Sequence, residues 1–82
     1  MAAGDDSPLL KLALADAEQE YRSARRKHAS INSAHEGWAV LFEEFDELWD
    51  EVKKKQPSKE AMRAEAVQVA AMALAFMIEV CG

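Results

Sequence analysis

The architecture of this chain follows from AVQVAAMALAFMIEV, residues 66–80, because this run is apolar nearly all the way round a helix. A helix with apolar side chains on every side must be covered on every side. Two partner helices from a chain of 82 residues can hardly cover it. We therefore expect a homo-oligomer, most simply a two-fold dimer in which these helices meet in a shared bundle core, with a tetramer as the larger alternative.

The composition favours an all-α protein. Ala, Glu, Lys, Leu and Met are abundant, whereas the chain has only three glycines, two prolines and six aromatic residues. At 82 residues the chain forms one domain at most. We expect a flexible N-terminus over residues 1–6 and a single helical domain over residues 7–82.

Charge and cysteine content narrow the class of protein further. The formal net charge of −5 argues against binding of a nucleic acid polymer, which requires a basic surface, but it allows a nucleotide that arrives with a metal ion. Cys81 has no partner for an internal disulfide, and the start, MAAGDDSP, lacks the features of a signal peptide. We therefore expect a cytoplasmic protein. We expect no membrane contact either, because residues 66–80 fall short of the roughly 20 residues that span a bilayer and include Gln68 and Glu79.

The first predicted helix begins at Ser7 as N-cap, with Pro8 at the first helical position, and runs to about His28. Its apolar residues recur at spacings of three and four, which predicts one buried face. That face consists of Leu10, Leu14, Ala17, Tyr21, Ala24 and His28.

Two further helices follow in a helix-turn-helix arrangement. Ser33 and Glu36 form an S-x-x-E capping box, in which the glutamate is expected to accept from the N–H of Ser33, so the second helix begins there and ends before Pro57. Ser58 caps the third helix, which runs to about Val80. The predicted core face of the second helix consists of Trp38, Leu41, Phe45, Leu48 and Val52.

Acidic residues border these apolar faces. Glu44, Glu47 and Glu51 share one face of the second helix, and Glu65 and Gln68 share one face of the third. A buried carboxylate needs a partner, and acids on two antiparallel helices converge on a point where a hard cation such as Mg²⁺ finds oxygen ligands. The commoner use of such acids is a solvated face, paired here with Lys53, Lys54 and Arg63.

The motif EEFDE, residues 43–47, matches E-E-x-x-E, and Glu65 follows it across one helix turnaround. Together with the apolar third helix, this pattern resembles the E-E-x-x-E … E-x-x-D signature of the MazG-like nucleoside triphosphate pyrophosphohydrolases, in the all-α NTP pyrophosphatase superfamily. The resemblance covers residues 35–79 and implies a MazG-like domain. It also implies a hydrolase that cleaves a nucleoside or deoxynucleoside triphosphate into a monophosphate and pyrophosphate.

The resemblance further implies a site for Mg²⁺, with Mn²⁺ as an alternative. The metal ligands would be Glu44, Glu47, Glu65 and Gln68, and Glu43 and Glu47 would serve in catalysis, Glu43 by orienting the attacking water. Gln68 stands where the family has Asp, and a carboxamide carries no charge and cannot act as a base. Either the site is shifted toward Asp46, Asp50 or Glu51, or it binds metal weakly, or catalysis is lost. The alternative function is a non-catalytic helical oligomerisation or interaction module with a degenerate metal site.

Three other residues are candidate substrate contacts. Arg25 would contact a phosphate, and His28 or Trp49 would stack on a nucleobase. Each has a structural alternative. The basic cluster around Arg25 is explained by pairing with Glu18 and Glu20 on the same helix, His28 by packing, and Trp49 by a subunit contact.

Overall fold

The computed structural model describes residues 7–82, which contain three α-helices and no β-strand. The helices are α1 (Ser7–Lys27), α2 (Ala34–Val52) and α3 (Lys59–Ala75), and the π-helical turn η2 (Phe76–Val80) continues α3. The predictions of an all-α fold and of three helices are therefore confirmed. The expected flexible N-terminus, residues 1–6, and the side chain of the predicted cap Ser7 lie outside the described part of the chain.

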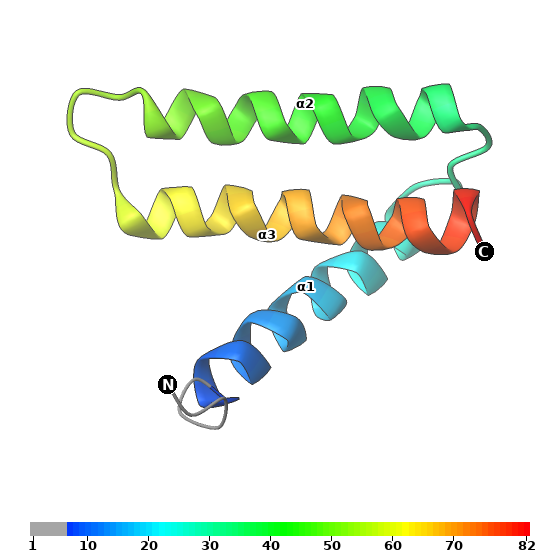
Figure 1. Ribbon diagram of the computed structural model, residues 1–82, viewed down its shortest axis with the longest axis horizontal. Helices are drawn as coiled ribbons and strands as arrows, with labels where there is room; N and C mark the ends of the chain where they lie inside the picture. Colours follow the sequence, from blue (N-terminus) through cyan, green and yellow to red (C-terminus); the bar gives the residue numbers. More distant parts are fainter. Residues whose placement is uncertain (1–6) are drawn as a thin grey trace.

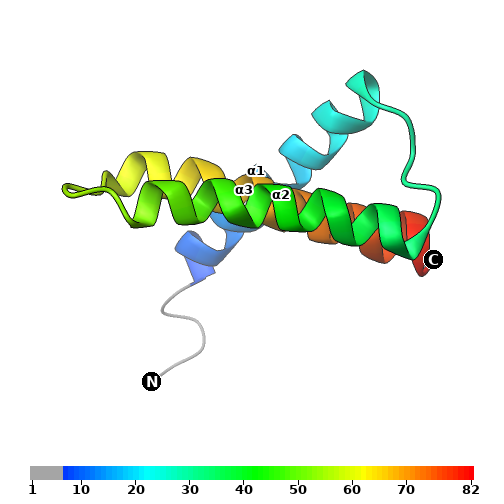
Figure 2. The same ribbon diagram turned by 90° about the horizontal axis from the view of Figure 1, so that it is seen from above.

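The helices α2 and α3 lie side by side and antiparallel, and α1 crosses α3 obliquely (Figures 1 and 2). The contacts between elements join α2 to α3, α1 to α3 and α2 to η2, whereas α1 and α2 make no direct helix contact. The apolar helix α3 is thus the central element, as its sequence requires, and α1 and α2 cover different sides of it.

Side-chain caps fix the starts of α2 and α3. The Ser33 Oγ accepts from the N–H of Glu36 at 3.0 Å, and the Ser58 Oγ accepts from the N–H of Ala61 at 3.1 Å. Both predicted caps are confirmed. The capping box differs in one bond, because Glu36 Oε1 accepts from the N–H of Asn32 at 2.6 Å instead of from that of Ser33.

One acidic side chain ties the end of the chain to α1 and to the loop before α2. Glu79, in η2, forms an ion pair with Arg25 at 2.9 Å and accepts hydrogen bonds from the Tyr21 hydroxyl at 3.3 Å and from the N–H of Ile31 at 2.9 Å. The side chain of Glu79 is only 9% exposed. Charge-assisted bonds of this kind are stronger than neutral ones, so Glu79 holds three segments in place.

The buried core is small and made of small residues. Ala17 of α1 and Ala71 and Ala75 of α3 are the buried hydrophobic residues among those described. Gly37 of α2 is also buried, and a Cβ at this position would lie 2.5 Å from the ring of Phe76. The close approach of α2 to η2 therefore depends on the missing side chain at residue 37.

The predicted core faces of the first two helices are wrong in part. Leu14 in α1 is 60% exposed because the N-terminal half of α1 extends past α3, and Leu10 is exposed for the same reason (Figure 1). On α2, Leu41 and Leu48 are half-buried. The rest of that face is exposed, because periodicity identifies an apolar face but not which neighbour covers it. The exposed members of the two predicted faces are Leu10, Leu14, His28, Trp38, Phe45 and Val52.

The helical segment Lys59–Val80 has 22 residues and, by length and composition, is apolar enough to cross a membrane. It is longer than the apolar run of residues 66–80 from which we expected no membrane contact. Core helices of soluble proteins meet the same criterion, but only 11% of the most apolar window of this segment is buried.

Candidate metal centre and adjoining cleft

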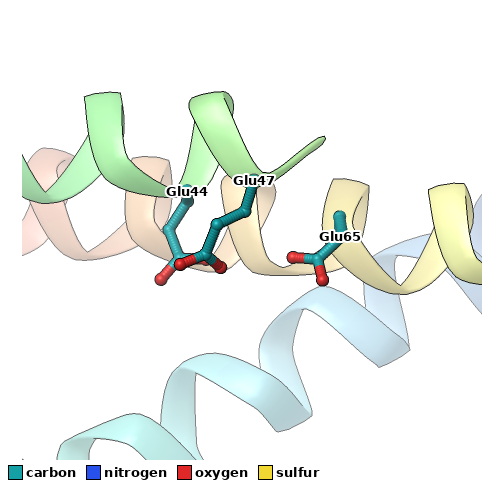
Figure 3. A group of neighbouring side chains, drawn as sticks. All are labelled: Glu44, Glu47 and Glu65. Carbon is teal, nitrogen blue, oxygen red and sulfur yellow. The ribbon is translucent and has the colours of Figure 1, made fainter. Parts of the chain in front are cut away.

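Three glutamates from two helices converge between α2 and α3. Glu44 and Glu47 lie one turn apart on α2, and Glu65 projects from α3 toward them, with α1 passing beside the group (Figure 3). One carboxylate oxygen of each residue lies within 4.8 Å of the other two. A single cation placed between these oxygens would have a ligand from every one of the three side chains.

The environment of these carboxylates is unfavourable for three bare negative charges. Glu44 Oε1 and Glu65 Oε1 are both buried and have no hydrogen-bond partner. Burial raises the pKa of Glu44 above its ordinary value, and the negative charges of Glu47, Glu65 and Glu43 raise it further. A buried carboxylate oxygen without a partner costs free energy, which a bound cation would remove.

No basic side chain of residues 7–82 neutralises the group. Ion pairs join Lys53 to Asp50 and Lys54 to Glu51, so the interpretation as a solvated, paired face holds for these two acids. Arg63 pairs with an acid of α1. None of the ion pairs in the described residues includes Glu44, Glu47 or Glu65.

A cleft of about 470 Å³ opens beside this group, between α1, the loop after it, α2 and α3. Its volume lies within the usual range of small-molecule sites. The lining combines acidic side chains of α2 with basic side chains at the end of α1. The chemically distinctive members of the lining are Glu43, Glu44, Gln68, Arg25, Lys27 and His28.

Four of the other predicted site residues line the cleft, and one does not. Glu43 is exposed and Gln68 is half-buried, and both line the cleft with Glu44. His28 and Arg25 line it too, but the guanidinium of Arg25 is bound to Glu79 and to the Ser30 hydroxyl rather than to Glu18 or Glu20. Trp49 is absent from the lining and is 54% exposed elsewhere on α2.

Sequence reasoning did not identify Tyr21 or Glu79 as part of the cleft wall. Both line it, and their hydrogen bond joins α1 to η2 across 58 positions of the chain. The available signal was Glu79 itself, the one acid in an otherwise apolar run. An isolated acid in such a run needs a partner, but the sequence does not say that the partner is Arg25.

No protein-family model matches this chain, and neither do the curated proteins or solved structures to which it was compared. The resemblance to the MazG-like enzymes therefore depends on the acidic motif and on the convergence of its side chains.

Proposed function

We propose that this protein is a Mg²⁺-dependent nucleotide pyrophosphohydrolase that converts a nucleoside or deoxynucleoside triphosphate into the monophosphate and pyrophosphate. The observation that supports this proposal most is the convergence of Glu44, Glu47 and Glu65 within 4.8 Å beside a cleft. These three residues belong to the acidic pattern that resembles the family signature.

The residues fit a hard divalent cation. Glu44 and Glu65 each have one buried oxygen without a partner, and Glu47 adds a carboxylate from the more exposed side. Gln68 lines the same cleft and offers a neutral carboxamide oxygen. When bound, Mg²⁺ or Mn²⁺ would neutralise phosphate charge and polarise the phosphorus centre.

The remaining residues of the cleft have separate tasks in this proposal. Glu43 is exposed and lines the cleft. In the proposed reaction its carboxylate would accept a proton from the attacking water molecule. Lys27 brings positive charge to the other wall, where a polyphosphate needs it, and His28 lines the same wall. Arg25 acts indirectly, because its ion pair with Glu79 holds the loop that completes the wall.

A second candidate function is a non-catalytic helical interaction module. Two observations favour it: Gln68 replaces an acid of the family pattern, and a row of large apolar side chains on α2 is exposed. In that case the three glutamates would bind a cation without hydrolysis, or bind none.

The test is incubation of the protein with a panel of nucleoside and deoxynucleoside triphosphates and millimolar Mg²⁺, with separation of the products. The enzyme should release monophosphate and pyrophosphate, whereas a diphosphate and orthophosphate would indicate cleavage at another bond. Glu47→Gln should abolish the reaction, and Asp46→Asn, one position away and exposed, should preserve it. Absence of turnover on the whole panel, or equal turnover by Glu47→Gln, would refute the proposal.

A further inference from the structure

The outer surface of α2 carries a continuous apolar stripe. Its residues follow one another at spacings of four, three, four and three, so they share one side of the helix. Their exposed fractions range from 41% to 66%. The stripe, called here the aromatic face, consists of Trp38, Phe42, Phe45, Trp49 and Val52.

The aromatic face points away from the metal centre. At about 100° per residue, Phe45 lies about 100° round α2 from Glu44 and about 160° from Glu47. On α3, Ala66 and Ala70 are exposed and lie about 100° or more from the buried Ala71. Phe45 lies about 160° round α2 from Glu43, and Ala66 and Ala70 each lie about 160° round α3 from Gln68. Because Glu43 and Gln68 both line the cleft, these alanines and the aromatic face lie on the side of the hairpin away from the cleft. That side therefore joins a row of large side chains to a row of small ones.

We infer that this side of the hairpin binds a second copy of the chain, with the two α2 helices antiparallel and the two-fold axis near Phe45. Trp38 and Val52 each stand seven positions from Phe45, so Trp38 of one copy would meet Val52 of the other copy across the axis. The aromatic side chains of one copy would pack over the Ala66 and Ala70 surface of its partner. The result is a four-helix core made of two hairpins, in which α2 is central and not α3 as the sequence suggested.

The area of the aromatic face suits such a dimer. An aromatic side chain buries about 150–250 Å² when covered, and the four aromatic residues here are 54–66% exposed. They would together bury roughly 350–600 Å² in each copy, and thus about 700–1,200 Å² in a dimer before α3 contributes, a range that includes the roughly 1,000 Å² of a specific interface. The isolated chain also needs this cover, because the buried hydrophobic residues in the described part of the chain are alanines.

The helix dipoles favour the antiparallel orientation. Lys53 and Lys54 are already paired with Asp50 and Glu51, and Glu36 lines the cleft on the other side of α2, so these side chains do not set the orientation. An antiparallel pair places the positive N-terminus of each α2 beside the negative C-terminus of its partner, whereas a parallel pair would align the two dipoles.

The first test is the mass of the full chain in solution, measured by light scattering and sedimentation over a wide concentration range. The wild type should be a dimer, and Phe45→Glu should be a monomer that keeps its helical circular dichroism. Leu14→Glu is the matched control, because Leu14 is 60% exposed and Phe45 is 61% exposed. It should remain a dimer.

The second test is cross-linking across the two-fold axis. In a Cys81→Ala background, which removes the single native cysteine, Phe45→Cys should form a disulfide-linked dimer under mild oxidation. Glu43→Cys, on the cleft side of the same helix, should not. The two tryptophans of the chain both lie in the aromatic face, so their emission should shift to longer wavelengths as dilution dissociates the wild-type dimer.

Three results would overturn the inference. The first is a wild-type chain that stays monomeric at every concentration. The second is dissociation by Leu14→Glu while Phe45→Glu remains dimeric. The third is a monomer whose tryptophan emission shifts only on addition of phosphatidylcholine or phosphatidylglycerol vesicles, which would assign the aromatic face to a lipid surface. The inference does not depend on hydrolysis, because the aromatic face and the two glutamates of the metal centre that α2 supplies lie on different sides of that helix.

Discussion

Replacement of Glu47 by Gln tests the metal centre through two opposite effects on stability. The substitution keeps the size of the side chain and removes one negative charge that lies within 4.8 Å of the oxygens of Glu44 and Glu65. Two unit charges at this separation repel each other by about 1 kcal/mol in a water-like medium and by about 3 kcal/mol at an effective dielectric constant of 20. Glu47 is exposed, so the lower value applies to each of its two contacts.

Without metal, Glu47→Gln should therefore raise the free energy of unfolding by about 1–2 kcal/mol, or the melting temperature by roughly 5–15 °C for a domain of this size. With metal this difference should close. A ligand at ten times its Kd stabilises the folded protein by about 1.4 kcal/mol. The wild type should thus gain roughly 5–10 °C at such a Mg²⁺ concentration, whereas the variant should gain almost nothing.

The assay is thermal unfolding followed by circular dichroism, in EDTA and in a series of MgCl₂ concentrations at constant ionic strength. Asp46→Asn is the control, because it removes one exposed charge from the same helix without touching the three glutamates. It should show neither effect. A lower metal-free melting temperature in Glu47→Gln, or an undiminished Mg²⁺ response in this variant, would refute the conclusion that the three carboxylates repel one another and bind one cation together. Loss of the Mg²⁺ response in Asp46→Asn would instead place the cation on the other side of α2.

Three further outcomes follow from the same geometry. The pKa of Glu44 is raised above 4.5 in the folded protein, so the free energy of unfolding without metal should fall as pH rises through the folded pKa. Urea unfolding at several pH values, with and without Mg²⁺, should show this fall only without metal. Glu79→Gln should cost about 2–4 kcal/mol in urea unfolding, because it leaves the charge of Arg25 unpaired. Glu18→Gln should cost less than about 1 kcal/mol, since its ion pair on the same helix is exposed. Gln68→Asp should lower the Mg²⁺ concentration at half-maximal stabilisation, and an unchanged midpoint would exclude residue 68 from the ligand set.

The helix starts at Ser33 and Ser58 were predictable because a cap is a local device. A serine, the backbone N–H three residues later and the following apolar periodicity are all visible within one short window of sequence. The same locality explains why Glu44 and Glu47 were correctly placed on one face. Their convergence with Glu65 required only that two neighbouring helices pack antiparallel across a short turn.

The predictions that failed depend on tertiary packing. Trp38 and Phe45 follow the core periodicity of an amphipathic helix as well as Leu41 and Leu48 do, and only the position of α3 decides which edge is covered. The network of Glu79 was missed for a related reason. Its hydrogen bonds reach across the chain to Tyr21 and Ile31, and no pattern within η2 specifies such distant partners.

The motif EEFDE contains residues of two surfaces with different chemistry. Glu44 and Glu47 turn toward Glu65 of α3, and Glu44 lines the cleft, while Phe45, between them in sequence, lies on the exposed apolar side of α2. A helix turn of about 100° per residue makes this separation possible without any insertion. Glu47→Gln should therefore remove the Mg²⁺ response and leave a dimer, whereas Phe45→Glu should dissociate the dimer and leave the three carboxylates together. Because each substitution changes only one of the two surfaces, the proposed enzyme and the inferred dimer can be refuted independently of each other.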